Sequence, residues 1–300
     1  MSKVFFAKDI TKVDQLFDSA EIGSLIAPAD PVALKIHFGE PGNTAYLKPD
    51  EVKPVFEKVK ACAGKPYYTD CNTLYSGPRG KTKTHLQVAK DHGYNDVIIP
   101  EEEDFVTRDV NLKHFKKVYL GSQVAKSPVI IALTHFKGHE LTGFGGTLKN
   151  LGMGFGTRLG KLKMHQDCIN CAEIKSCRKN QTVEACWIGS PAMAQEKIVE
   201  YAYGAVQGKK CAYFNFIIRV SPNCDCFGHN DPPIVPDIGV LASLDPVAID
   251  QASVDLVNQT ESSLKSRNKF RALYSNVNWE IQLKYAQEIG LGSRKYELVS

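Results

Sequence analysis

Short apolar runs alternate with amphipathic segments along the first 135 residues. The apolar runs predict strands, because each is short and rich in β-branched residues. Two segments between them have proline or polar residues at the start and glycine at the end, which predicts helices. The predicted strands are 31–38, 65–70, 95–100, 115–121 and 127–135, and the predicted helices are 49–64 and 81–93. Strands separated by helices favour a parallel sheet covered on both faces.

The alternation resumes in the last third of the chain. Helices are predicted at 191–208, 245–259 and 278–290, and strands at 210–220, 237–243 and 295–299. We therefore predict an α/β fold with a mostly parallel sheet, helices on both faces and a short cysteine-rich insert. The predicted units are an N-terminal lobe (1–163) ending in a glycine-rich site loop, a metal-binding insert (164–190) and a C-terminal lobe (191–300).

Polar residues follow several of the predicted strands. His37, residues 70–73, His135 and residues 223–226 each come at or just beyond a strand's carboxyl end. Ligands of open α/β sheets bind at that edge, so we expect these residues to converge there. Within this set, Asn72 is a candidate cofactor contact.

Overall charge and hydropathy exclude some classes of protein. The net charge is +4 and there is no long basic run, which argues against nucleic acid as a partner. No apolar stretch approaches the roughly 18 residues that span a membrane. The N-terminus lacks the pattern of a signal peptide, so we expect a cytoplasmic location.

Four of the nine cysteines lie close together in the insert, with the spacing C-x2-C-x5-C-x8-C. Clustered cysteines in a reducing compartment suggest a metal, and four thiolates suit either zinc or an iron–sulfur cluster. The usual bacterial run is C-x2-C-x2-C-x3-C-P, and here Trp187 stands in place of proline. We predict an iron–sulfur cluster, with structural zinc as the alternative and His165 as a further candidate ligand. The four cysteines are Cys168, Cys171, Cys177 and Cys186.

A second constellation lies in the segment SPNCDCFGHNDPP. Cys224 and Cys226 form a C-x-C pair with His229 nearby in sequence. This spacing is less diagnostic than C-x2-C. Buried thiols and a metal-linked role therefore remain equally open, as does the question whether this pair joins the main site.

Residues 133–156 are rich in glycine and carry basic groups. The GK-Ser/Thr ending of a phosphate loop is absent, and no G-x-G-x-x-G follows a strand. Backbone amides of Gly143, Gly145 and Gly146, together with Lys149 and Arg158, nevertheless suit an anionic, nucleotide-like ligand. The alternative interpretation is a solvated basic face.

The same stretch contains candidate catalytic groups. His135 and His139 are four residues apart, and Lys149 follows ten residues after His139. Histidine transfers protons near neutral pH or binds metal, and lysine holds anions or becomes covalently attached to a cofactor. Together with His37, these residues are our candidates for catalysis.

Several blocks of the chain resemble one known family. They are KIHFGEPGNTAYLKP, TDCNTLYSGPRG, HFKGHELTGFGGTLKNLGMG, NCDC and PIVPDIGVLASLDPVAIDQASVDLVN. The chain resembles, over nearly its whole length, the uncharacterised Fe–S-centre protein family, which is defined by a domain of unknown function found widely in bacteria and archaea. The resemblance implies ferredoxin-like cysteine motifs inserted after the glycine region, and it implies no settled reaction.

A more distant resemblance concerns His139, the sequence TGFGG, Lys149 and His165. This pattern is similar to one in the nickel-pincer lactate racemase family. The resemblance implies that Lys149 carries or contacts a pincer nucleotide, that His165 is a metal ligand and that His139 is a proton-transfer base.

These observations predict a metal-centre protein that acts as a redox or metal-dependent enzyme on a small anionic molecule. The first alternative is a racemase-like or isomerase-like enzyme with a metal–nucleotide cofactor. The second is a non-catalytic metal or electron-carrier protein with structural zinc. The expected partners are a small anionic ligand and an electron-transfer protein, and whether the chain is an enzyme stays open.

Overall fold

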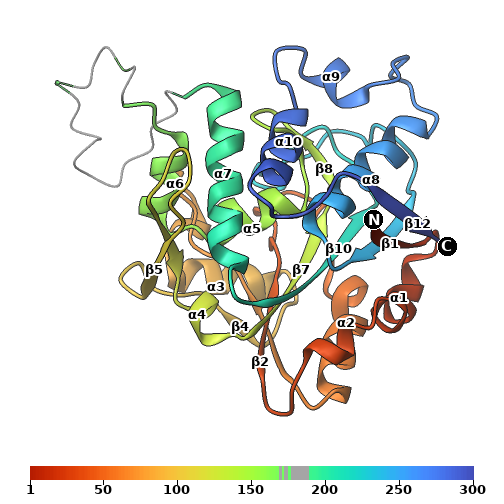
Figure 1. Ribbon diagram of the computed structural model, residues 1–300, viewed down its shortest axis with the longest axis horizontal. Coiled ribbons are helices and arrows are strands. Elements are labelled where there is room, and N and C mark those ends of the chain that lie inside the picture. Colours follow the sequence, from red (N-terminus) through yellow and green to blue (C-terminus); the bar gives the residue numbers. More distant parts are fainter. Residues whose placement is uncertain (169–170, 172–174, 177–188) are drawn as a thin grey trace.

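A central eight-stranded sheet organises the chain in the computed structural model, which describes all residues except 169–170, 172–174 and 177–188 (Figure 1). The strands β10, β7, β2, β3 and β4 are parallel to one another, whereas β11 is antiparallel to both β10 and β1. The predicted α/β fold with a mostly parallel sheet is confirmed. In spatial order the strands are β12 (Tyr296–Val299), β1 (Ser2–Ala7), β11 (Gly239–Ser243), β10 (Lys210–Ile217), β7 (Val129–His135), β2 (Pro31–Lys35), β3 (Lys65–Thr69) and β4 (Val97–Ile98).

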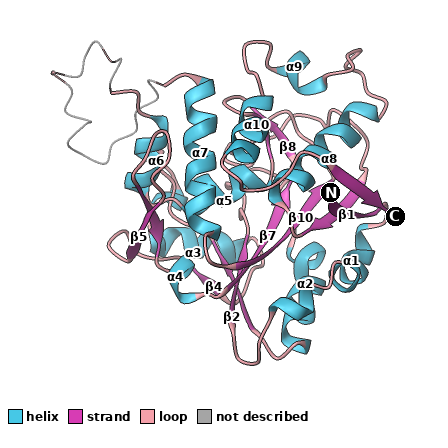
Figure 2. Cartoon of the chain, in the orientation of Figure 1, coloured by secondary structure: helices cyan, strands magenta, loops and turns pink. Residues whose placement is uncertain are grey.

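Each face of the sheet is covered by its own hydrophobic cluster. Figure 2 shows helices on both sides of the strands. Successive residues of a strand point to opposite faces, so Ala33 and Ile130 enter one cluster while Leu34 and Ile131 enter the other. The first cluster contains α5 (Thr147–Phe155), α7 (Pro191–Val206), α8 (Pro246–Gln259) and α10 (Glu280–Glu288). The second contains α1 (Val13–Ser19), α2 (Pro49–Ala61) and part of α3 (Thr82–Asp91).

The predicted elements are present with shorter ends, and several others were not predicted. The expected strand at 115–121 is β6 (Lys117–Gly121), which pairs with β5 (Phe105–Asp109) in a separate antiparallel ribbon. The remaining elements are η1 (Ile10–Lys12), η2 (Ile22–Leu25), η3 (Pro78–Gly80), α4 (Gln123–Lys126), β8 (Lys137–His139), β9 (Gly143–Gly145), α6 (Arg158–His165) and α9 (Lys269–Leu273).

The glycine-rich stretch forms the β8–β9 hairpin and then helix α5. Glycines inside a helix normally weaken it, but here they allow close packing. A Cβ at Gly152 would lie 2.0 Å from the Ile198 carbonyl oxygen of α7, and one at Gly154 would lie 2.2 Å from Lys35 Cε. These glycines therefore bring α5 against α7 and against the end of β2.

The order of the strands defines where the site lies. From β2 the chain moves outward through β3 and β4, then returns to place β7 on the other side of β2. This reversal creates a crevice at the carboxyl ends of β2 and β7, the usual ligand position in open α/β sheets. The sheet takes strands from both predicted lobes, and the boundaries at 163 and 190 stay predictions.

In the described part of the chain, no helix combines the length and apolar content needed to cross a bilayer.

Candidate metal centre and its cavity

A cavity of about 610 Å³ opens at the carboxyl ends of β2 and β7. It gathers most of the residues that the sequence singled out, from β2, β3, β7, the hairpin, α5 and α6. Those lining it are His37, Asp70, Cys71, Thr73, His135, His139, Gly145, Gly146, Lys149, His165 and Cys226.

Of the predicted catalytic and cofactor-binding residues, three do not line this cavity. The amide of Asn72 is buried and donates to the Thr82 hydroxyl at 2.9 Å. Arg158 Nη1 contacts Glu102 at 2.6 Å, near the surface. Gly143 packs on Trp279, where a Cβ would lie 2.6 Å from the Trp279 Cβ.

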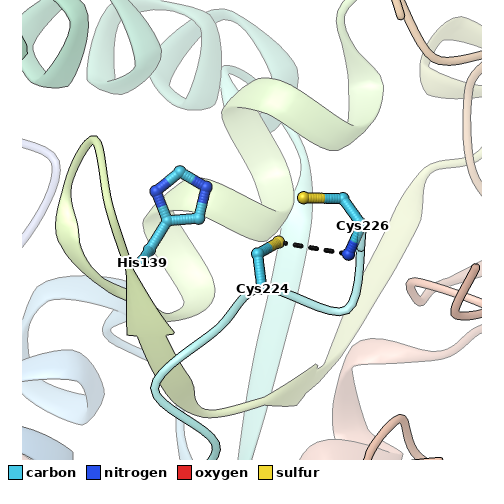
Figure 3. A group of neighbouring side chains, drawn as sticks. All are labelled: His139, Cys224 and Cys226. Atoms are coloured by element: carbon cyan, nitrogen blue, oxygen red, sulfur yellow. Dashed lines mark hydrogen bonds between the residues drawn. The ribbon is translucent and has the colours of Figure 1, made fainter. Parts of the chain in front are cut away.

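His139, Cys224 and Cys226 form a potential metal-binding group. Their ligand atoms all lie within 4.8 Å of one another, and Figure 3 shows the imidazole and the two thiols gathered around one space. His139 and Cys224 are buried, and Cys226 is half-buried. One nitrogen and two sulfur ligands match the Cys2His set of catalytic zinc sites, which keep a fourth position for water or substrate. In this group His139 stands where sequence proximity had suggested His229.

The hairpin and the loop after β10 bring these ligands together across a long stretch of sequence. The Gly138 N–H donates to the Ser221 carbonyl at 2.8 Å. A Cβ at Gly138 would lie only 2.2 Å from the Pro222 carbonyl oxygen. Glycine at this position thus lets β8 lie against the loop, which places His139 beside Cys224.

Asp225, between the two cysteines, orients their loop. Its carboxylate accepts from His135 Nδ1 at 2.9 Å and lies 3.0 Å from Lys137 Nζ. His135 Nε2 in turn lies 2.8 Å from the Ile218 carbonyl oxygen. Both nitrogens of His135 are thus engaged, and the ring holds the Cys-Asp-Cys segment against β7.

Lys149 places a positive charge beside the thiols of Cys224 and Cys226. Its Nζ lies 3.4 Å from Cys224 Sγ. A hydrogen bond from Cys226, with help from Lys149 and His139, lowers the pKa of the Cys224 thiol well below its ordinary value despite burial. Burial opposes a charged lysine, but the two neighbouring cysteines more than offset this and raise the pKa of Lys149. A thiolate is the form of cysteine that binds metal.

The His139 ring has an unusual hydrogen-bond arrangement for a metal ligand. Its Nδ1 accepts from the backbone N–H groups of Leu141 at 3.2 Å and Thr142 at 3.3 Å. In the neutral ring the proton therefore sits on Nε2, whereas the second nitrogen of a metal-bound histidine normally donates. For a metal to bind at Nε2, the proton would have to move to Nδ1, and the two hydrogen bonds from Leu141 and Thr142 would be lost.

A second cluster, of oppositely charged groups, surrounds Asp70. Lys35 Nζ lies 3.0 Å from Asp70 Oδ1 and donates to Asn150 Oδ1 at 2.8 Å. Arg79 Nε lies 2.8 Å from Glu40 Oε2. Lys161 Nζ donates to the Gly156 carbonyl at 2.6 Å. Lys35, Asp70, Arg79 and Lys161 all line the cavity.

His37 and His165 contribute two further rings to the cavity. His37 Nδ1 accepts from the Gly39 N–H at 3.1 Å, and burial lowers the pKa of His37 well below its ordinary value. Burial, with His139 and Lys149 nearby, lowers the pKa of His165 to about 3. Both rings are therefore neutral near pH 7.

The cysteine insert is only partly described. Cys168 and Cys171 belong to the described residues, whereas Cys177 and Cys186 lie outside them. The four-cysteine site and its iron–sulfur cluster therefore stay predictions.

Three charged residues of this cavity were not predicted from the sequence. Lys35, in the apolar run PVALKIHF, carried a visible signal, because a cation inside a buried strand needs a partner. Arg79 and Lys161 gave no comparable signal, because their place in the cavity depends on tertiary packing. Asp225 lies within residues 223–226, which were expected at the site, but its contact with His135 was not predicted.

No curated protein matches the chain. The lactate racemase apoprotein from Thermoanaerobacterium thermosaccharolyticum is 14% identical, with 73% of this chain and 51% of that chain covered and a TM-score of 0.42. A Thermotoga maritima protein is 10% identical, with 94% and 60% covered and a TM-score of 0.45. The chain thus matches between half and three fifths of the length of these two structures.

A family model for a domain of unknown function, DUF362, matches residues 32–255. That span runs from β2 to α8 and includes His139, Cys224 and Cys226. The chain therefore belongs to the DUF362 family.

Proposed function

We propose that this protein is a metal-dependent enzyme whose metal is held by His139, Cys224 and Cys226 and whose substrate is a small anion. The observation that carries the proposal is the convergence of these three ligands beside one cavity. Because His139 and Cys226 also line that cavity, a molecule bound there can reach the metal. A fourth, exchangeable position on the metal is what substrate activation requires.

The charge of the cavity supports an anionic substrate. Among the described residues, five cationic side chains line it, against two carboxylates. The cations are Lys35, Arg79, Lys137, Lys149 and Lys161, and the carboxylates are Asp70 and Glu140. When bound, the metal would polarise an oxygen of the substrate. The chain's own groups orient the anion and, through the neutral His37, donate a hydrogen bond.

The test compares two sets of cysteines in one experiment. Protein purified without oxygen from zinc-supplemented or iron-supplemented cells is analysed for metal and acid-labile sulfide. We expect Cys224→Ser and His139→Ala to lose the metal that the wild type holds at this centre. The matched control, Cys168→Ser with Cys171→Ser, changes two thiols of the insert and should leave that metal in place.

The outcomes separate the two locations. If the variants at Cys224 and His139 keep their full metal content, the proposed centre is wrong. If iron and sulfide disappear only in the insert variant, the chain carries a separate cluster in the insert, as the spacing there predicts. If the insert variant loses all of the bound metal, the group of His139, Cys224 and Cys226 does not bind metal.

A further inference from the structure

Among the buried cations around Asp70, one forms no ion pair with a carboxylate of the described residues. Lys35 pairs with Asp70, and Arg79 pairs with Glu40 and lies 3.6 Å from Asp70 through Nη1. Lys161 is the third cation, and its ammonium forms no ion pair within 4.0 Å with a carboxylate of the described residues. Two carboxylates thus face three cations in the interior.

Lys161 is unusually placed for a lysine. It is 5% exposed, lines the cavity and makes one hydrogen bond with the described residues, to the Gly156 carbonyl. An ammonium group has three donors, so two remain for a ligand. Arg79 Nη1 is also buried without a hydrogen-bond partner among the described residues. Buried cationic donors without acceptors are costly, which points to an acceptor that enters from the cavity.

We propose that Lys161, assisted by Arg79, binds an oxyanion group, a carboxylate or a phosphate, of the small molecule held in this cavity. The oxyanion accepts the two remaining Lys161 N–H donors and balances the excess positive charge. If the proposed function holds, the bound molecule spans from this anionic group to the metal centre. The subsite itself requires no metal.

The surroundings of Lys161 make its charge depend on pH. It is faced by Asp70 and Cys71 after β3, by Lys35 at the end of β2 and by Arg79 in η3. Burial lowers the pKa of Lys161 to about 8, although Cys71 and Asp70 act in the opposite direction. A bound anion favours the charged form, so anion binding should weaken as the pH rises through this value.

The experiment measures stabilisation by inorganic phosphate and by succinate at constant ionic strength, with chloride as the reference anion. The four proteins are the wild type, Lys161→Met, Lys163→Met and Cys224→Ser. Lys163 is a matched control, because it lies on the same helix and does not line the cavity. Without anion, Lys161→Met should unfold at the same temperature as the wild type or higher, since it removes a buried unpaired charge.

We expect phosphate or succinate to raise the unfolding temperature of the wild type, Lys163→Met and Cys224→Ser. In Lys161→Met the apparent Kd for the effective anion should rise roughly tenfold or more. The anion that raises the unfolding temperature, phosphate or succinate, identifies the bound group as a phosphate or a carboxylate. Equal stabilisation of Lys161→Met and wild type overturns the proposal, and so does the absence of any effect on the wild type. The metal proposal is tested separately by the metal content of Cys224→Ser. An unchanged content would contradict the metal centre but not the anion site.

Discussion

At the residue scale, neighbouring backbone groups decide which nitrogen of each histidine can act. Gly39 N–H donates to Nδ1 of His37, which lines the cavity, so the neutral ring carries its proton on Nε2. His135 differs, because both of its nitrogens are already engaged with protein groups. Among these rings, His37 is therefore suited to donate to a bound oxygen, and His135 is suited to hold the cysteine loop.

The tautomer of His37 can be measured directly. In protein with ¹⁵N-labelled histidine, we expect the His37 ring to be the neutral Nε2–H form from about pH 6 to 8, because Nδ1 is occupied as an acceptor. His37→Phe assigns the signal. Gly39→Ala should disturb it, since Gly39 has φ +82° and a Cβ there would lie 2.5 Å from the Tyr46 ring. A proton on Nδ1 in the wild type would contradict this assignment.

The sequence identified His37 and His135 as site residues because they follow strand ends, and that placement depends on local pattern alone. It did not identify the pairing of His139 with Cys224 and Cys226, which depends on how the hairpin meets a loop 85 residues away. Arg158 was predicted from the basic segment around it. Arg158 does not line the cavity, and its guanidinium instead contacts Glu102 and the Thr73 carbonyl.

At the element scale, helix α5 is held at its start by a residue of another helix. Its N-cap position is Gly146, which has no side chain to cap the first turn. Asp250 of α8 accepts from the N–H groups of Thr147 at 2.7 Å and Leu148 at 2.9 Å. A Cβ at Gly146 would lie 2.4 Å from Asp250 Oδ1, so glycine is required for this contact. The carboxylate also interacts favourably with the positive end of the helix.

The stability of this junction should depend on pH. Burial raises the pKa of the Asp250 carboxyl to about 6, above the ordinary value of 3.8. The folded protein therefore holds this proton more tightly than the unfolded chain does, and the resulting stabilisation is lost as the pH rises from about 4 through 6. In urea unfolding, the wild-type free energy minus that of Asp250→Asn should fall by about 2 to 3 kcal/mol over this window. Parallel pH profiles for the two proteins would show that Asp250 does not titrate there.

The elements themselves were predicted well where they are long and periodic, and poorly where tertiary packing decides. Helix α5 is an example, because its two internal glycines read as a loop until their contacts with Ile198 and Lys35 are known. The β6 run was identified as a strand, but nothing local shows that it pairs with β5 outside the main sheet.

At the scale of the whole molecule, the two ends of the chain meet in one sheet. Strand β1 pairs with β11 on one side and with β12 on the other, and Val4 within it is fully buried. No strand was predicted at β1, whose pairing partners in β11 lie more than 230 residues away in the sequence. The N-terminal strand is therefore a central strand among those that the C-terminal part of the chain contributes to the sheet.

Two truncations test this arrangement. Deleting residues 1–7 should abolish folding or soluble expression, because it leaves both β11 and β12 without their shared neighbour. Deleting residues 296–300 removes only the outermost strand and should lower the unfolding temperature by several degrees. If both truncated proteins unfold at the same temperature, β1 is not the structural centre of this half of the sheet.

The separation of the proposed metal ligands along the chain has a consequence for how the protein is made. His139 leaves the ribosome 85 residues before Cys224, and the two cysteines follow β10 in the sequence. A nascent chain that ends before Cys224 therefore lacks two of the three proposed ligands. Loading of the Cys2His centre would be a late, post-translational event, and its occupancy would report that the sheet has closed correctly.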